Sequence, residues 1–132
     1  VNFEGLPFDA AERRVLGVDH AEVAAELLAS WNLPEEVVSA ARWHHQPAGA
    51  EGRHQQIVDI VHVADALAMR QGWGTGVDMG KYILDEQSVA RIGLTAETAE
   101  QVIAQVEPEF QELRELYITG ARGAGRPSRQ PA

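Results

Sequence analysis

The sequence contains no cysteine, which excludes disulfide bonds and any metal site built from thiolates. It also has no apolar stretch approaching the roughly 20 residues that a membrane-spanning helix requires. The first residues show no basic segment followed by an apolar core, so we expect no signal peptide. Together these absences argue against a membrane partner. They do not fix the compartment, and the cytoplasm is the default expectation.

Positive charge is scarce as well, with 11 basic residues against 20 acidic ones and a net charge of −9 at pH 7. Three of the arginines lie beyond Gly120, so residues 1–119 carry 8 basic and 20 acidic groups. Binding the phosphates of DNA or RNA requires clustered Lys and Arg, so this balance argues against a nucleic-acid partner. Nucleotide phosphates would also be repelled unless a metal ion or local cations offset the negative charge.

No segment of useful length alternates apolar and polar residues, so the sequence predicts no β-strand. Apolar residues instead recur at helical spacing, and 132 residues fit one domain with a single core. The predicted fold class is all-α, a compact bundle of about five to six helices. We expect a lead-in segment over residues 1–8, the helical domain over residues 9–119 and a disordered Gly/Pro/Arg tail over residues 120–132.

Capping residues and apolar spacing define the individual helices. Asp19 caps a helix with Glu22 three residues later, and the following helix runs to about His45. The predicted buried face of the Asp19-capped helix consists of Val23, Leu27, Leu28 and Trp31. Residues 54–70 form the most apolar helix, which predicts a central position. A long helix follows Thr95 and must kink or divide at Pro108.

Three of the five histidines fall where helices could direct them at a single point. His44 and His45 are successive residues at a predicted helix end, so their side chains would diverge by about 100°. His20 lies in the first turn of an earlier helix, and Asp65 lies on or beside the apolar stripe of residues 54–70. A carboxylate in that place must find a partner, because burying an unpaired charge costs on the order of several kcal/mol.

These residues form either a metal site or a polar cluster that ties helices together, and the pattern alone leaves both open. Imidazole and carboxylate ligands suit iron, manganese or zinc, and one tetrahedral ion usually needs three protein ligands. Asp59, His62 and Asp65 share about 120° of helical arc, which is typical of a solvated helix edge, most of all for Asp59. No serine has the context that a Ser-His-Asp triad requires.

Three segments in combination indicate a protein family far more specifically than any one of them alone. They are Leu16-Gly17-Val18-Asp19-His20-Ala21-Glu22-Val23, Ala41-Arg42-Trp43-His44-His45 and Ile60-Val61-His62-Val63-Ala64-Asp65. The combination resembles the HDOD domain of bacterial signalling proteins, over roughly residues 12–117. This family is related to the HD superfamily of all-helical, metal-dependent phosphohydrolases, which includes the HD-GYP cyclic-dinucleotide phosphodiesterases. The resemblance implies an HD-domain-like fold and corresponds to the C-terminal part of the family domain.

The resemblance also implies that His20, His44, His45 and Asp65 occupy positions that ligate metal in catalytic relatives. Two catalytic elements are absent, because the chain contains no His-Asp dipeptide and no Gly-Tyr-Pro element after His45. Without the His-Asp pair, half of a two-metal site is missing, together with the group that would orient a bridging hydroxide. The four residues are therefore candidate metal ligands of a site that is vestigial in this chain.

The leading hypothesis is a non-catalytic, cytoplasmic signal-transduction domain that requires no cofactor and contacts other signalling proteins. If the chain corresponds to the C-terminal part of the family domain, the helices that precede this part are missing. Their absence would leave apolar faces of the central helix uncovered, which favours a homodimer. The alternative is a metal-dependent phosphohydrolase for nucleotides or cyclic dinucleotides, with iron, manganese or zinc held by the same four residues. A metal site that is structural only is the third possibility.

Overall fold

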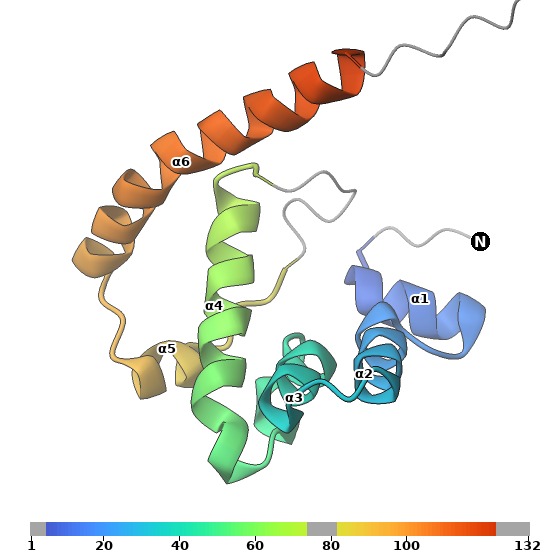
Figure 1. Ribbon diagram of the computed structural model, residues 1–132. Coiled ribbons are helices and arrows are strands. Elements are labelled where there is room, and N and C mark those ends of the chain that lie inside the picture. Colours follow the sequence, from blue (N-terminus) through green and yellow to red (C-terminus); the bar gives the residue numbers. More distant parts are fainter. Residues whose placement is uncertain (1–4, 74–81, 124–132) are drawn as a thin grey trace, which may run out of the picture. The chain divides into compact units, whose positions relative to one another are not determined.

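Every regular element that the structure describes is helical. The computed structural model describes residues 5–73 and 82–123, and Figure 1 shows the elements in chain order. They are α1 (Phe8–Leu16), α2 (His20–Ser30), α3 (Glu35–Trp43), α4 (Gln55–Arg70), α5 (Glu86–Ile92) and α6 (Ala96–Gly123), with 3-10 turns at Pro47–Gly49 and Gly52–His54. The all-α prediction is confirmed over the described ranges. No helix in these ranges has the length and apolar character needed to cross a membrane.

The chain divides into two units after Leu94. The first unit, residues 1–94, holds α1 to α5, and the second, residues 95–132, holds α6. α6 continues through Pro108 as a single helix, so this proline does not divide it. The helix extends past Gly120, where we expected the tail to begin, and ends at Gly123. The rest of the expected tail, residues 124–132, and residues 1–4 of the expected lead-in segment lie outside the described residues.

Local capping chemistry sets the helix ends as predicted. The Asp19 carboxylate accepts the backbone N–H of Glu22 at 2.9 Å and begins α2. Gly17 ends α1 with a φ of 80°, a left-handed conformation that glycine adopts without steric cost. Before α6, the Thr95 hydroxyl accepts the backbone N–H of Thr98 at 3.2 Å. These boundaries depend on residues only a few positions apart, which explains why the sequence predicts them.

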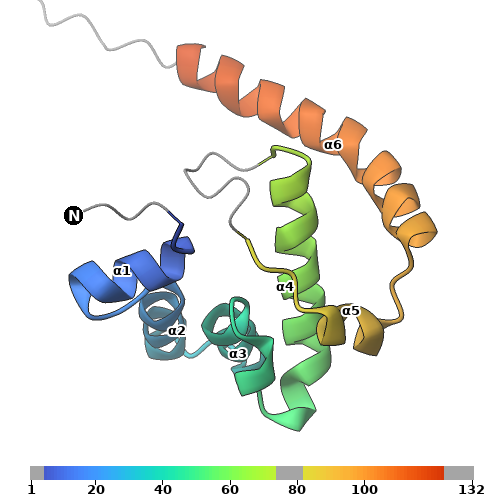
Figure 2. The same cartoon turned by 180° about the vertical axis from the view of Figure 1, so that it is seen from behind.

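The central helix of the first unit is α4, as its apolar composition predicted. It packs against α3, α5 and both 3-10 turns, while α2 packs against α3 (Figure 2). The buried apolar residues are all small, namely Ala21, Ala25, Ala40, Val58, Val63 and Ala66. Small side chains allow helix axes to approach closely, so the helices of the first unit pack at short distances through narrow apolar faces.

The predicted buried face of α2 is wrong for three of its four residues, and only Leu28 is partly buried. Val23, Leu27 and Trp31 are 54%, 46% and 63% exposed, whereas Ala21 and Ala25 are buried. The α2–α3 contact uses the alanine face, because only small residues fit between the two closely packed helices. The larger apolar side chains therefore occupy the solvent side of α2, where they form one stripe with a spacing of four residues.

Asp59 also lies inside the fold, which contradicts its expected place on a solvated helix edge. Its side chain is fully buried and its carboxylate accepts two hydrogen bonds from Arg91, each 2.7 Å long. Ser88 donates at 2.7 Å and Gln55 at 3.1 Å. The Arg91 contact holds the pKa of the Asp59 carboxyl below its ordinary value, despite burial. The contact fastens α5 to α4.

Replacing Asp59 tests this contact. Asp59→Asn keeps the size of the side chain but removes the negative charge to which Arg91, Ser88 and Gln55 all donate hydrogen bonds. We expect the free energy of unfolding to fall by about 3 kcal/mol, measured by urea denaturation near neutral pH. The matched control is Glu35→Gln, which removes an exposed contact with Arg53 and should cost less than about 1 kcal/mol.

Acid should weaken the same contact. Because the folded-state pKa of Asp59 is lowered, its stabilisation is fully present above the ordinary value and is lost as the pH falls through the lowered one. The wild-type protein should therefore lose stability below about pH 4 by an amount that Asp59→Asn lacks. Parallel acid profiles for the two proteins would contradict this assignment.

Candidate metal centre

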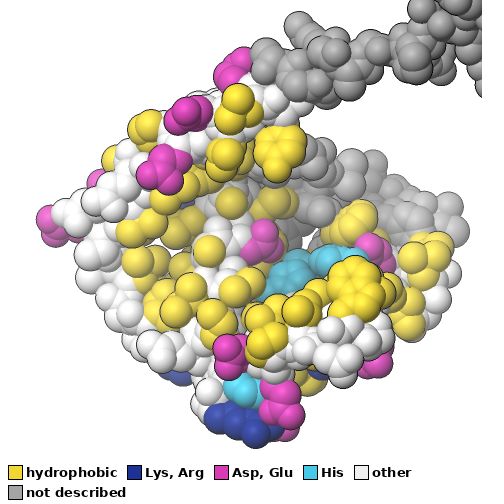
Figure 3. All heavy atoms as spheres, viewed as in Figure 1, with side chains coloured by type: hydrophobic (Ala, Val, Ile, Leu, Met, Phe, Trp, Pro, Cys, Tyr) yellow, Lys and Arg dark blue, Asp and Glu magenta, His cyan; other side chains and the backbone are white. Residues whose placement is uncertain are grey.

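His20, His44 and His45 meet at one place in the first unit. One ligand-capable nitrogen from each lies within 4.8 Å of the others. The ring centroids are 4.0 Å apart for His44 and His45, and 4.7 Å apart for His20 and His45. A histidine group reaches the surface beside hydrophobic side chains (Figure 3). Three of the four predicted ligands are thus brought together; we call them the histidine cluster.

His44 and His45 were expected to diverge, and their rings lie close together at the end of α3. The helix ends at Trp43, and its capping residue His44 keeps a helical backbone conformation. The chain then turns, and the backbone N–H of Gln46 donates to the carbonyl of Trp43 at 2.9 Å. Gly49 lies directly against the Trp43 indole, where a Cβ would collide with the ring. This tight turn, which the sequence pattern did not predict, directs both rings to the same side.

Glu12 of α1 holds the ring of His20. Its Oε2 accepts the backbone N–H of His20 at 3.0 Å and lies 2.5 Å from Nδ1 of the ring. An ionised carboxylate only accepts hydrogen bonds, so Nδ1 carries the proton and Nε2 presents its lone pair. Nε2 of His20 lies 2.8 Å from Nε2 of His45, which therefore donates to it.

The ring of His44 is held through its Nδ1 atom, as is the ring of His20. Its Nδ1 lies 2.8 Å from the carbonyl oxygen of Ala41, which can only accept. The proton is therefore on Nδ1, and Nε2 has a free lone pair. A carboxylate or carbonyl on the far nitrogen is the usual second partner of a metal-bound histidine. His20 and His44 both have one.

His45 is neutral at physiological pH. Burial, followed by the positive charges that His44 and His20 would carry, lowers its pKa from 6.5 to about 4. The carboxylates of Asp9 and Asp65 act in the opposite direction but do not overcome burial. A histidine must be neutral to bind a metal, so the surroundings of His45 favour the ligating form.

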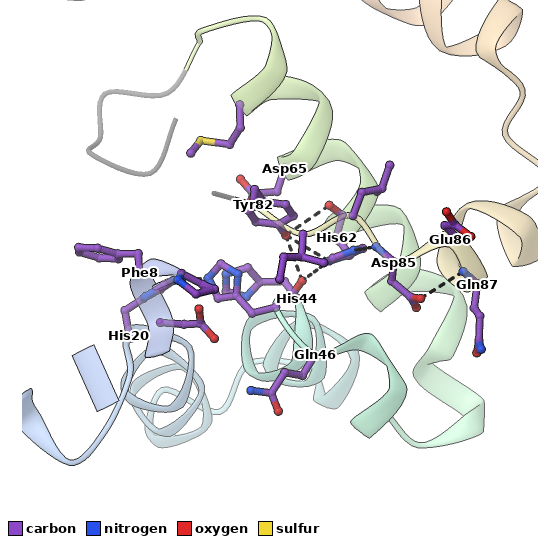
Figure 4. Close-up of a pocket in the computed structure, with 16 residues that line it drawn as sticks. Phe8, His20, His44, Gln46, His62, Asp65, Tyr82, Asp85, Glu86 and Gln87 are labelled. Carbon is purple, nitrogen blue, oxygen red and sulfur yellow. Dashed lines mark hydrogen bonds between the residues drawn. The ribbon is translucent and has the colours of Figure 1, made fainter. Parts of the chain in front are cut away.

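Asp65, the fourth predicted ligand, lies outside the histidine cluster. It lines the same cavity, where it lies near Tyr82 (Figure 4). Burial and the Asp65 carboxylate raise the pKa of Tyr82 above its ordinary value. The Tyr82 hydroxyl is also 3.1 Å from the His44 carbonyl oxygen. Tyr82 is thus a shared neighbour of Asp65 and of the His44 backbone.

His62 lies inside the fold and contacts the His44 backbone, although its helical spacing was typical of a solvated edge. It is 1% exposed. Its Nε2 accepts the backbone N–H of Asp85 at 2.9 Å, so Nδ1 carries the proton and donates to the His44 carbonyl oxygen at 2.5 Å (Figure 4). Both nitrogens are used, so His62 positions His44 and ligates nothing. Its apolar neighbours Val61 and Val63 were the one available sign of burial.

The histidine cluster opens into a cavity of about 720 Å³ between α1, α4 and residues 82–87. Its charged lining residues are all acidic, namely Asp9, Asp65, Asp85 and Glu86. No described lining residue is Lys or Arg. A cavity with this lining attracts cations and repels phosphate groups unless a cation is already bound.

The donor set fits one metal ion. Three imidazole side chains, each with a ring that is held by a partner or buried, match the usual number of protein ligands for a single tetrahedral ion. Among the residues that the structure describes, no other group of His, Asp and Glu side chains is close enough to hold an ion. The described ligands are therefore too few for two ions.

Comparison with known proteins identifies relatives for the N-terminal part of the chain. The sequence model of the HDOD domain family matches residues 1–47, which contain α1, α2, α3 and the histidine cluster. This supports the expected resemblance, although the match lies N-terminal in the chain and does not reach the expected limit near residue 117. A Treponema pallidum protein described as uncharacterized is 38% identical over 48 residues, covering 36% of this chain and 9% of that protein. No solved structure matches.

The lowered pKa of His45 predicts a pH-dependent stability of the metal-free protein. Between pH 6.5 and about 4 the unfolded chain binds more protons than the folded chain, so stability rises with pH through this window. His45→Gln should lack this dependence, while the control His54→Gln should keep it. The free energy of unfolding, measured in chelator at about pH 4.5 and about pH 7.5, provides the comparison. An unchanged slope in His45→Gln would contradict the assignment.

Proposed function

We propose that this chain is a non-catalytic regulatory domain of HDOD type that acts through contacts with other signalling proteins. The ligand set carries the proposal, because the described side chains close enough to share an ion are three histidines and do not include Asp65. Two-metal hydrolysis needs a pair of ions about 3.5–4 Å apart, each with its own ligands. The described residues offer ligands for one ion only. The HDOD match over residues 1–47 agrees with a regulatory role.

In this proposal His20, His44 and His45 hold one divalent ion that fixes α2 against the turn after α3. The ion adds its binding free energy to the stability of the folded state, because the unfolded chain has no preformed site. Of the candidate metals iron, manganese and zinc, imidazole ligands favour zinc and iron, whereas manganese prefers oxygen ligands. The metal therefore acts as a structural tie between segments.

The exposed stripe of α2 supports a role in protein contacts. Val23, Leu27 and Trp31 point to solvent on one side of the helix. An apolar stripe that includes an exposed tryptophan is typical of a protein interface, since Trp is enriched at binding hot spots. A second copy of the chain is the simplest partner, and other signalling proteins can use the same stripe.

A phosphohydrolase is the second candidate function. The observation in its favour is the cavity of about 720 Å³ next to three histidines, since catalytic zinc sites combine three protein ligands with an open position. A bound ion would supply a Lewis acid and an activated water. The acidic lining opposes this candidate, because Asp9 and Asp65 would repel phosphate substrates.

Metal analysis of protein purified without chelators separates the candidates. We expect about one zinc or iron ion per chain, loss of the ion in His44→Ala and no phosphodiesterase turnover. His54→Ala removes a histidine outside the cluster and is the matched control. Turnover on cyclic dinucleotides or nucleotides that His44→Ala abolishes would overturn the regulatory proposal. A wild-type chain without affinity for either ion would contradict the metal centre.

The α2 stripe predicts self-association that depends on Trp31. Sedimentation velocity from micromolar to millimolar concentration should show a monomer–dimer equilibrium for the wild-type protein. Trp31→Glu places a charge in the stripe and should yield a monomer throughout this range. The matched control Tyr117→Glu changes a similarly exposed aromatic residue on α6 and should leave the equilibrium unchanged. A wild-type monomer at all concentrations would contradict the dimer.

A further inference from the structure

We infer that Glu12 is the positioning residue of the histidine cluster, because it selects the His20 tautomer that presents Nε2 to His44 and His45. This role rests on the metal centre proposed above, but it also makes a claim about the metal-free protein. The family resemblance implies metal ligation by His20, His44, His45 and Asp65 and gives no role to Glu12. The inference comes from the contacts of one carboxylate.

The geometry of Glu12 is specific to the ring of His20. A single oxygen, Oε2, contacts both the backbone N–H and the ring Nδ1 of His20. The Glu12 side chain is 16% exposed, whereas the His20 side chain is 40% exposed. The more accessible imidazole is thus held by the more buried carboxylate. Without this acceptor, solvent would leave both tautomers and other ring orientations open to His20.

Helix capping alone does not explain Glu12. The start of α2 already has its capping residue, since Asp19 accepts the backbone N–H of Glu22 and pairs with Arg13. A carboxylate that served only the His20 backbone N–H would have no need to contact the ring. The ring contact therefore has a separate consequence, which is the position of the Nδ1 proton.

The group that contacts Nδ1 of His44 differs chemically from the Glu12 carboxylate. Nδ1 of His44 faces the carbonyl of Ala41, which the backbone of α3 supplies and which carries no net charge. Glu12 supplies a charged acceptor, which makes the imidazole a stronger donor toward a cation. Because it is a side chain, its charge and its hydrogen-bonding capacity can be removed separately by substitution.

Two substitutions separate these contributions. Glu12→Ala removes the acceptor, and we expect the affinity for Zn²⁺ and Co²⁺ to fall by about 10- to 100-fold. Glu12→Gln retains an oxygen that accepts the Nδ1 proton, so it should recover most of that loss. The matched control is Glu26→Gln, which changes an exposed carboxylate paired with Arg42 and should keep the wild-type affinity.

The readouts are a competition titration with a chromophoric chelator, the visible spectrum of bound Co²⁺, and the ¹⁵N shifts of His20 in the metal-free protein at one fixed pH. The ¹⁵N shifts distinguish protonated from unprotonated ring nitrogens and do not respond to a general loss of stability. We expect Nδ1–H in the wild-type protein and in Glu12→Gln, and a mixture of tautomers in Glu12→Ala.

The outcomes keep the two proposals distinct. If the wild-type protein binds neither ion but Glu12→Ala alone changes the His20 tautomer, the metal centre fails and the positioning role stands. If Glu12→Ala binds Zn²⁺ as tightly as the wild-type protein and keeps the Nδ1–H tautomer, the positioning role is overturned. If Glu12→Ala does not fold, a Glu12→Gln variant with a mixed tautomer overturns it equally.

Discussion

The buried imidazole of His62 is the contact on which the arrangement of the first unit depends. It joins three segments by two hydrogen bonds, because Nδ1–H donates to the carbonyl of His44 and Nε2 accepts the backbone N–H of Asp85. The first bond fixes the turn that directs His44 and His45 toward His20. The second fixes the start of α5, which the Asp59–Arg91 contact then secures along its length. His62 and Asp59, which lie on α4, thus position the turn after α3 and helix α5.

These polar contacts compensate for a thin apolar core. The buried apolar residues are alanines and valines, each of which contributes less burial free energy than leucine or phenylalanine. A buried charge or imidazole adds stability only when all of its partners are present, and His62 and Asp59 both meet this condition. No buried side-chain nitrogen or oxygen in the described residues lacks a partner. The helices are therefore held in specific positions more by hydrogen-bond geometry than by apolar volume.

Local features could be predicted from the sequence, and long-range pairings could not. The cap at Asp19 and the end of α1 at Gly17 depend on neighbouring residues, and both were predicted correctly. Asp59 and His62 were misplaced because their partners Arg91 and Asp85 are contributed by α5 and its capping residue. The convergence of the histidine cluster was expected from the places of these residues on the predicted helices and from the family resemblance. The role of Glu12 required the contact distances between its carboxylate and His20. The α2 stripe was assigned to the interior because periodicity shows that a face is apolar but not which face is covered.

The balance of charge around the histidine cluster favours a bound cation that is held rather than used on phosphates. Three neutral imidazoles leave the full charge of a divalent ion uncompensated, so neighbouring carboxylates must supply the balance. Asp9 and Asp65 are close enough to His45 to oppose the lowering of its pKa, and both line the cavity. In the proposed regulatory role the ion is held in place, and the described acidic lining would oppose the approach of a phosphate ester. The same carboxylates that would stabilise the ion therefore repel the substrate of a phosphohydrolase.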